Sequence, residues 1–228
     1  MIKTVLLDLD NTLLNFSASE KKAISKVLSA QNLPCSKDVL KRYSEINDLF
    51  WKRLETGEIT REQVLSGRFE TLFHELRAKN ASVSAAREMY EKALSESTDM
   101  VSGARELLDT LYKTYDLYIV SNGTAKIQDS RIEKTGIAPF FKDIFISQRI
   151  GYNKPSRSFL DACFAKIPQF SREQTVIVGD SMSSDISGGV QSGIHTLWFN
   201  PQNEKAKDIV PEYEAKSLSE IPKIISRM

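Results

Sequence analysis

Cysteine and histidine are scarce in this sequence of 228 residues, which contains two of each. Cys35 and Cys163 lie far apart and form no Cys-x-x-Cys pair, so the sequence has neither the spacing of a zinc site nor a disulfide framework. The histidines, His74 and His195, have no partner pattern. We therefore expect reduced thiols and structural histidines.

An excess of one charge and long apolar runs are also lacking. The 31 basic residues nearly balance the 30 acidic ones, which gives no basic surface for a nucleic-acid polymer or a membrane. No stretch approaches the roughly 20 apolar residues of a membrane helix. Residues 1–16 are apolar but contain Asp8 and Asp10 and lack a small-residue cleavage site, so no signal peptide is expected. We expect a cytoplasmic protein, as a monomer or a small homo-oligomer.

Short apolar runs with almost no alternation are typical of strands buried on both faces of a parallel sheet. Such runs cover residues 4–9, 116–120 and 175–178, and weaker candidates cover residues 144–147 and 194–199. Amphipathic stretches typical of helices alternate with them, at residues 104–115, 126–135, 156–166, 184–192 and 219–226. The pattern predicts an α/β fold with a doubly wound, mainly parallel sheet.

Residues 17–98 break this alternation, because they have the pattern of four helices without a convincing strand. Two capping-box patterns, Ser17 to Glu20 and Thr60 to Gln63, support helix starts. We predict a helical cap domain at residues 17–98, inserted into an α/β core of residues 1–16 and 99–228. An insertion after the first strand would lie above the carboxyl ends of the strands, where open α/β sheets bind ligands, and would act as a lid.

The first candidate site follows the first strand, in the run Asp8-Leu-Asp10-Asn-Thr12. Residues two apart on a strand project to the same side, so Asp8 and Asp10 are expected to converge, and a hard divalent cation would offset their repulsion. A solvated loop or a helix cap is the alternative. A calcium loop is excluded, because its sixth position is Leu13 instead of Gly and its twelfth is Ser19 instead of Glu.

Two further motifs have the chemistry of an anion site. The run from Ser121 to Thr124 follows a strand and leads into a helix, where a hydroxyl and outward-pointing amides can bind an anion. An ordinary turn has the same sequence. Lys154 precedes Pro155, which we expect in the first helical turn, and can neutralise a phosphate and crowded carboxylates together. A merely solvated lysine is the alternative.

The fourth motif, Gly179-Asp180-Ser181 followed by Asp185, closes another predicted strand. Asp180 could supply a third oxygen ligand to the metal, and Asp185 could orient that ligand or its water. Helix capping by Asp180 or Ser181 is the alternative, and the two roles can coexist.

Each of the four motifs follows a predicted strand, and their order along the chain resembles that of the haloacid dehalogenase superfamily of phosphatases. The helical insertion resembles the cap domain of one large subclass of that superfamily. The resemblance implies that Asp8 is a nucleophile that forms an aspartyl-phosphate, while Asp10 protonates the leaving oxygen and then activates water. It implies Mg²⁺ bound by Asp8, the backbone carbonyl of Asp10 and Asp180. It also implies phosphate binding by Ser121, the Asn122 amide and Lys154, and support from Thr12, Ser181 and Asp185.

Within that superfamily, the cap sequence at residues 47–69 resembles the pyrimidine 5′-nucleotidase branch. The resemblance implies that Phe50, Trp51 and Phe69 enclose a base and that Arg68 meets a carbonyl or a phosphate. Aromatic residues at helical spacing are also typical of a core, which is the alternative.

The sequence therefore predicts a Mg²⁺-dependent phosphomonoesterase acting on a small phosphorylated metabolite, with pyrimidine nucleoside monophosphates preferred. True dehalogenation is disfavoured, because displacing a halide requires no protonation and so no Asp10. A phosphosugar phosphatase or mutase with the same core is the enzymatic alternative. A non-catalytic module that binds metal and phosphate for regulation is the alternative of another class.

Overall fold

A computed structural model describes residues 1–206 and 209–228. The chain forms two compact units, one made of Met1–Asn15 with Thr98–Met228 and the other of Phe16–Ser97. Within the described residues, no helix combines the length and apolar character needed to span a membrane.

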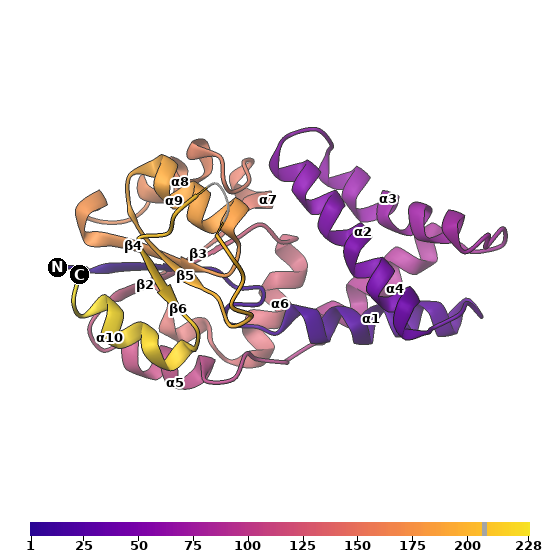
Figure 1. The fold of residues 1–228 in the computed structure, drawn as a ribbon, viewed down its shortest axis with the longest axis horizontal. Coiled ribbons are helices and arrows are strands. Elements are labelled where there is room, and N and C mark those ends of the chain that lie inside the picture. Colours follow the sequence, from indigo (N-terminus) through magenta and orange to yellow (C-terminus); the bar gives the residue numbers. More distant parts are fainter. Residues whose placement is uncertain (207–208) are drawn as a thin grey trace. The chain divides into compact units, whose positions relative to one another are not determined.

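The first unit is built on a sheet of six parallel strands within the described residues, in the order β3-β2-β1-β4-β5-β6 (Figure 1). The fold class predicted from the sequence is confirmed. The strands are β1 (Thr4–Leu7), β2 (Asp116–Ser121), β3 (Asp143–Ile146), β4 (Thr175–Gly179), β5 (His195–Phe199) and β6 (Tyr213–Ala215). The prediction missed β6, which is three residues long and lies at the sheet edge.

Helices cover both faces of this sheet, which explains why the central strands are mostly apolar. On one face, α5 (Ala104–Leu111), α6 (Ala125–Thr135) and α10 (Ile221–Ile225) pack against one cluster of strand side chains. On the other, α8 (Arg157–Phe164) packs against Leu6, Val120 and Ile177. The remaining short helices are α7 (Ser147–Ile150), α9 (Ser187–Ser192), the π-helical turn η3 (Met182–Ile186) and the 3-10 turns η1 (Ala138–Phe140), η2 (Arg172–Gln174) and η4 (Leu218–Glu220).

The second unit, all of which is described, consists of the helices α1 (Phe16–Ala30), α2 (Lys37–Glu55), α3 (Arg61–Glu75) and α4 (Val83–Ser95). The predicted capping box at Thr60 and Gln63 is present at the start of α3. The one at Ser17 is wrong, because α1 already begins at Phe16 and the Glu20 carboxylate accepts a hydrogen bond from Ser44 instead.

The chain leaves and re-enters the α/β unit at neighbouring points. The Asn15 amide donates to the Asp99 carbonyl over 2.9 Å, and the Val101 amide donates to the Leu13 carbonyl over 2.9 Å. Leu14 forms a short antiparallel bridge with Met100. Backbone hydrogen bonds of the α/β unit therefore hold the two ends of the helical insertion together.

Candidate active site

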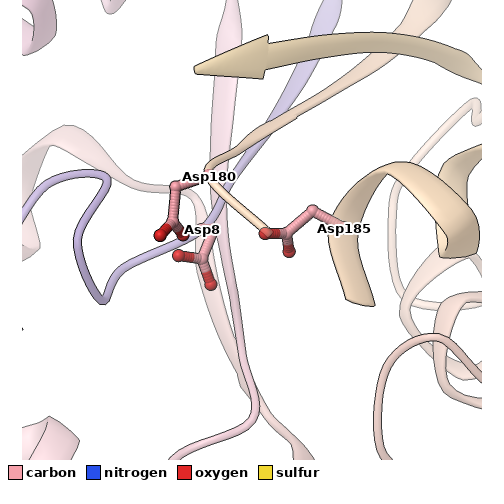
Figure 2. A group of neighbouring side chains, drawn as sticks. All are labelled: Asp8, Asp180 and Asp185. Carbon is pink, nitrogen blue, oxygen red and sulfur yellow. The ribbon is translucent and has the colours of Figure 1, made fainter. Parts of the chain in front are cut away.

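Among the described residues, three carboxylates meet at the carboxyl ends of β1 and β4 (Figure 2). Asp8 follows β1, Asp180 follows β4, and Asp185 lies in η3. One oxygen atom from each lies within 4.8 Å of the others. Asp8 is 6% exposed and Asp185 is completely buried. Three acidic groups from two distant chain segments are thus concentrated in one small volume, in which Asp8 and Asp185 are buried and Asp180 is partly buried.

Lys154 supplies the positive charge in this cluster. Its ammonium group donates to Asp8 Oδ1 over 2.7 Å, to Asp185 Oδ1 over 2.6 Å and to the Val120 carbonyl over 2.7 Å. All three ammonium hydrogens are used in these bonds. Lys154 is buried, so the alternative of a merely solvated lysine is wrong. Pro155 lies in a turn before α8, which begins at Arg157, and not in the first helical turn as predicted.

The electrostatics of the cluster favour an additional cation. Burial raises the pKa of Asp8 from 3.8 to about 7, although Lys154 acts in the opposite direction. Burial, and then the charges of Asp8 and Asp185, raise the pKa of Asp180 well above its usual value. For Lys154, burial acts to lower the pKa, but Asp185 and Asp8 outweigh it and raise the pKa. One ammonium group cannot balance three ionised carboxylates, so the donor set fits a hard divalent cation with oxygen ligands.

Asp180 is held through its backbone, which leaves its carboxylate available as a ligand. Its amide donates to Thr12 Oγ1 over 3.1 Å, and its carbonyl accepts from the Trp198 indole over 2.8 Å. Among the described residues, no group donates a hydrogen bond to its carboxylate. Thr12, predicted to support the metal ligands, therefore contacts Asp180 directly.

Asp185 has both carboxylate oxygens engaged, so its geometry suits orientation more than ligation. Oδ1 accepts from Lys154, and Oδ2 accepts from the Ser181 amide over 3.1 Å. Ser181 also caps η3, because its hydroxyl accepts from the Ser184 amide, so the predicted helix capping by this residue is present. A Cβ on Gly179 would lie 2.2 Å from Asp185 Oδ2, so only glycine admits Asp185 here.

Ser121 ends β2 with its hydroxyl oriented by two donors. Its oxygen accepts from the Gly123 amide over 3.2 Å and from Gln128 Nε2 over 2.9 Å. Both lone pairs are then used, so the hydroxyl hydrogen remains to donate to an anion. The Asn122 side chain instead exchanges two hydrogen bonds with the backbone of Lys154, over 2.8 and 2.9 Å. This pair ties the lysine turn to the end of β2.

The Asp10 carboxylate does not belong to the acidic cluster that Asp8 forms. It accepts from Gln128 Nε2 over 2.6 Å and from Arg131 Nη1 over 2.5 Å. Because β1 ends at Leu7, residues 8–10 lie outside the strand and do not alternate as strand residues do. The charge of Asp10 nevertheless acts on Asp8 and on Asp180, where it contributes to the raised pKa of both groups.

Sequence reasoning missed Gln128 and Arg131, although a signal was present. Both polar residues fall between Ile127 and Ile132 around α6, on the face that the amphipathic pattern assigns to the interior. Buried polar groups on such a face require partners. Arg131 is 1% exposed and finds its partner in Asp10.

The four cap residues singled out from the sequence divide into two pairs. Arg68 and Phe69 lie in the interior of the helical unit, where the Arg68 guanidinium is 4.5 Å from the Tyr90 ring and Phe69 packs against Tyr90 and other aromatic rings. Phe50 and Trp51 on α2 are partly exposed. Only the second pair presents surface that a ligand can reach in this unit.

Comparison with known proteins finds similarity to one family of hydrolases. The family described as haloacid dehalogenase-like hydrolase matches residues 5–199. The HAD-hydrolase YfnB of Bacillus subtilis is 37% identical over 225 residues, which cover 98% of this chain and 95% of YfnB. The pyrimidine 5′-nucleotidase PynA of Streptococcus pneumoniae is 36% identical, covering 96% and 93%. The pyrimidine 5′-nucleotidase YjjG of Escherichia coli is 26% identical, covering 98% and 97%.

A solved structure is also similar over the whole chain. The crystal structure of YfnB has a TM-score of 0.92 with this structure and covers 98% of both chains. That YfnB crystal is described as bound to magnesium and as revealing interdomain movement.

Proposed function

The chain belongs to the haloacid dehalogenase-like hydrolases, and from this premise we propose that it is a Mg²⁺-dependent phosphomonoesterase with Asp8 as its nucleophile. The observation that carries the proposal is the buried cluster of Asp8, Asp180, Asp185 and Lys154. A carboxylate that attacks a phosphate must approach another anion, so the site has to supply positive charge. Here Lys154 supplies one positive charge, and the carboxylates fit a divalent cation that would supply more.

In the proposed first half-reaction, an Asp8 oxygen attacks phosphorus, and the bond from phosphorus to the ester oxygen breaks. Asp10 gives its proton to that leaving oxygen. The Ser121 hydroxyl and the charge of Lys154 stabilise the phosphoryl oxygens in the transition state. Asp8, Asp180 and the Asp10 carbonyl would hold Mg²⁺, which when bound neutralises charge on the phosphate.

In the second half-reaction, water attacks the phosphorus of the aspartyl-phosphate, and the bond to Asp8 breaks. Asp10, now a carboxylate, takes the proton from that water, so a single group serves as acid and then as base. Lys154, which is itself held by Asp185, donates to Asp8 Oδ1 and so orients the Asp8 side chain for the reaction.

For the substrate, we propose pyrimidine nucleoside monophosphates. The similarity to PynA and YjjG, both pyrimidine 5′-nucleotidases, supports this class. Phe50 and Trp51, with partly exposed rings, would contact the base. Arg68 and Phe69 would act indirectly, by packing inside the helical unit and holding α3 in place.

A substrate panel tests the proposal. The purified protein with Mg²⁺ is assayed for phosphate release from pyrimidine and purine nucleoside monophosphates, hexose and pentose phosphates and 4-nitrophenyl phosphate. The highest kcat/KM is expected for a pyrimidine nucleotide. A higher kcat/KM for a sugar phosphate would replace the nucleotidase proposal with a phosphosugar phosphatase. Phosphate binding without turnover of any ester would replace it with a regulatory module.

A further inference from the structure

Helix α6 holds Asp10 through two buried side chains. Gln128 is 2% exposed and Arg131 is 1% exposed. Each oxygen of the Asp10 carboxylate receives a hydrogen bond from one of them, Oδ2 from Gln128 and Oδ1 from Arg131. Two donors on two oxygens fix the rotation of the carboxylate, and each oxygen keeps a second lone pair for proton transfer.

Gln128 also connects Asp10 to Ser121. One hydrogen of its Nε2 is donated to Asp10 and the other to Ser121, while its Oε1 accepts from Arg131 Nη1 over 3.0 Å. Both hydrogens and the oxygen of this amide form hydrogen bonds, so its orientation is set by the network itself. The side chain lies so close to Gly123 that a Cβ there would be 2.3 Å from Nε2. The glycine therefore makes room for the contact between Gln128 and Ser121.

We propose that Gln128 and Arg131 are positioning residues for proton transfer by Asp10, an inference that rests on the proposed phosphatase function. When Asp10 gives its proton to the leaving oxygen, it becomes a carboxylate, and the Arg131 guanidinium stabilises that charge. Gln128 keeps the carboxylate at a fixed place relative to the Ser121 hydroxyl, and so relative to the phosphoryl group whose oxygen must be protonated.

The dependence of kcat/KM on the pKa of the leaving group separates a role in proton transfer from a merely structural role. Phenols of low pKa leave without full protonation, whereas the 5′-oxygen of a nucleotide requires a general acid, whose contribution is typically about 10²- to 10⁴-fold. We would measure kcat/KM of the full chain for aryl phosphates of rising leaving-group pKa and for a pyrimidine nucleotide, because kcat/KM reports phosphoryl transfer to Asp8. For Arg131→Met, the expected loss is about 10-fold or less with 4-nitrophenyl phosphate and about 10²-fold or more with the nucleotide.

Two variants serve as companions. Gln128→Met keeps the side-chain volume but removes the amide, so it should show the same dependence on the leaving group, and it decides the question if Arg131→Met does not fold. Arg149→Met is the matched control, because it removes a guanidinium that pairs with Asp129 of α6 on the surface. It should leave kcat/KM unchanged for every ester.

The outcomes separate this inference from the function on which it rests. An equal loss for every ester, no loss, or faster turnover of the nucleotide in both folded variants would overturn the positioning role and leave the phosphatase function intact. If the wild-type protein hydrolyses none of the esters, the proposed function fails and the positioning role fails with it.

Discussion

Replacing the proposed nucleophile should abolish turnover and at the same time make the α/β unit more stable. Burial raises the pKa of Asp8 to about 7, so the folded protein favours the protonated form of this group. Stability due to this group is fully present below its ordinary pKa of 3.8 and is lost as the pH rises through about 7. Asp8→Asn supplies a permanently neutral group of the same shape, and its advantage should therefore grow with pH.

The magnitude follows from the size of the shift. A rise from 3.8 to about 7 corresponds to about 4 kcal/mol of unfolding free energy in the absence of metal. We expect Asp8→Asn to gain about 2–4 kcal/mol at pH 8 in a chelator, because its amide must still find acceptors among Asp180 and Asp185. With a slope of about 2–3 kcal/mol per molar urea, the unfolding midpoint should rise by about 1 M.

The assay can be confined to the α/β unit. The chain has two tryptophans, and Trp198 donates to the Asp180 carbonyl in the cluster. In a Trp51→Phe background, urea unfolding followed by fluorescence reports on Trp198 alone. Asp109→Asn, an exposed position on α5, is the matched control and should change stability by less than about 0.5 kcal/mol.

Three results together would support the reasoning. The gain of Asp8→Asn should be present at pH 8, shrink toward pH 4, and be smaller when Mg²⁺ replaces the chelator, because the cation relieves the same repulsion in the wild type. An Asp8→Asn protein that is less stable than the wild type at pH 8 in chelator would show that the buried carboxylate charge is already compensated.

Other predictions concern the lysine, the metal and the helical unit. Lys154→Ala should lower kcat by about 10²-fold or more, measured with Mg²⁺ on the best substrate, because it removes charge from the developing transition state; an unchanged kcat would contradict this role. Chelation should abolish phosphate release and added Mg²⁺ should restore it, whereas activity that persists in chelator would exclude the metal requirement. Burial raises the pKa of Glu20 from 4.5 to about 7, so stability due to this group is present below 4.5 and declines by about 3 kcal/mol as the pH rises through 7. Glu20→Gln should remove that decline in urea unfolding followed by helical circular dichroism, and an equally steep decline in the variant would refute this assignment.

The strands and the order of the motifs could be predicted because they depend on local sequence. Strands buried on both faces must be apolar at most positions. The strands at residues 4–7, 116–121 and 175–179 have such apolar runs. β6 lacks this signal, because an edge strand of three residues with an exposed Glu214 carries no apolar run.

The detailed geometry of the site could not be predicted, because it depends on contacts between distant segments. Asp8 and Lys154 were expected to act together, and they do form a buried ion pair. The direction of the Asp10 carboxylate depends on Gln128 and Arg131, which are more than 100 residues away in the sequence and belong to no motif. The Lys154 ammonium donates all its hydrogens to Asp8, Asp185 and a backbone carbonyl. These three partners are likewise set by the packing of distant segments and could not be predicted from the sequence.

The hydrogen bonds that join Asn15 to Asp99 and Leu13 to Val101 have a consequence for evolution and engineering. These hydrogen bonds within the α/β unit hold the two ends of the inserted segment side by side. The segment is therefore attached to the α/β unit at a single junction. A helical segment of another length could replace this one at the junction without changing the backbone of the α/β unit on either side. Under the proposed function, replacing this segment would change which substrates are bound without altering Asp8, Asp180 or Asp185.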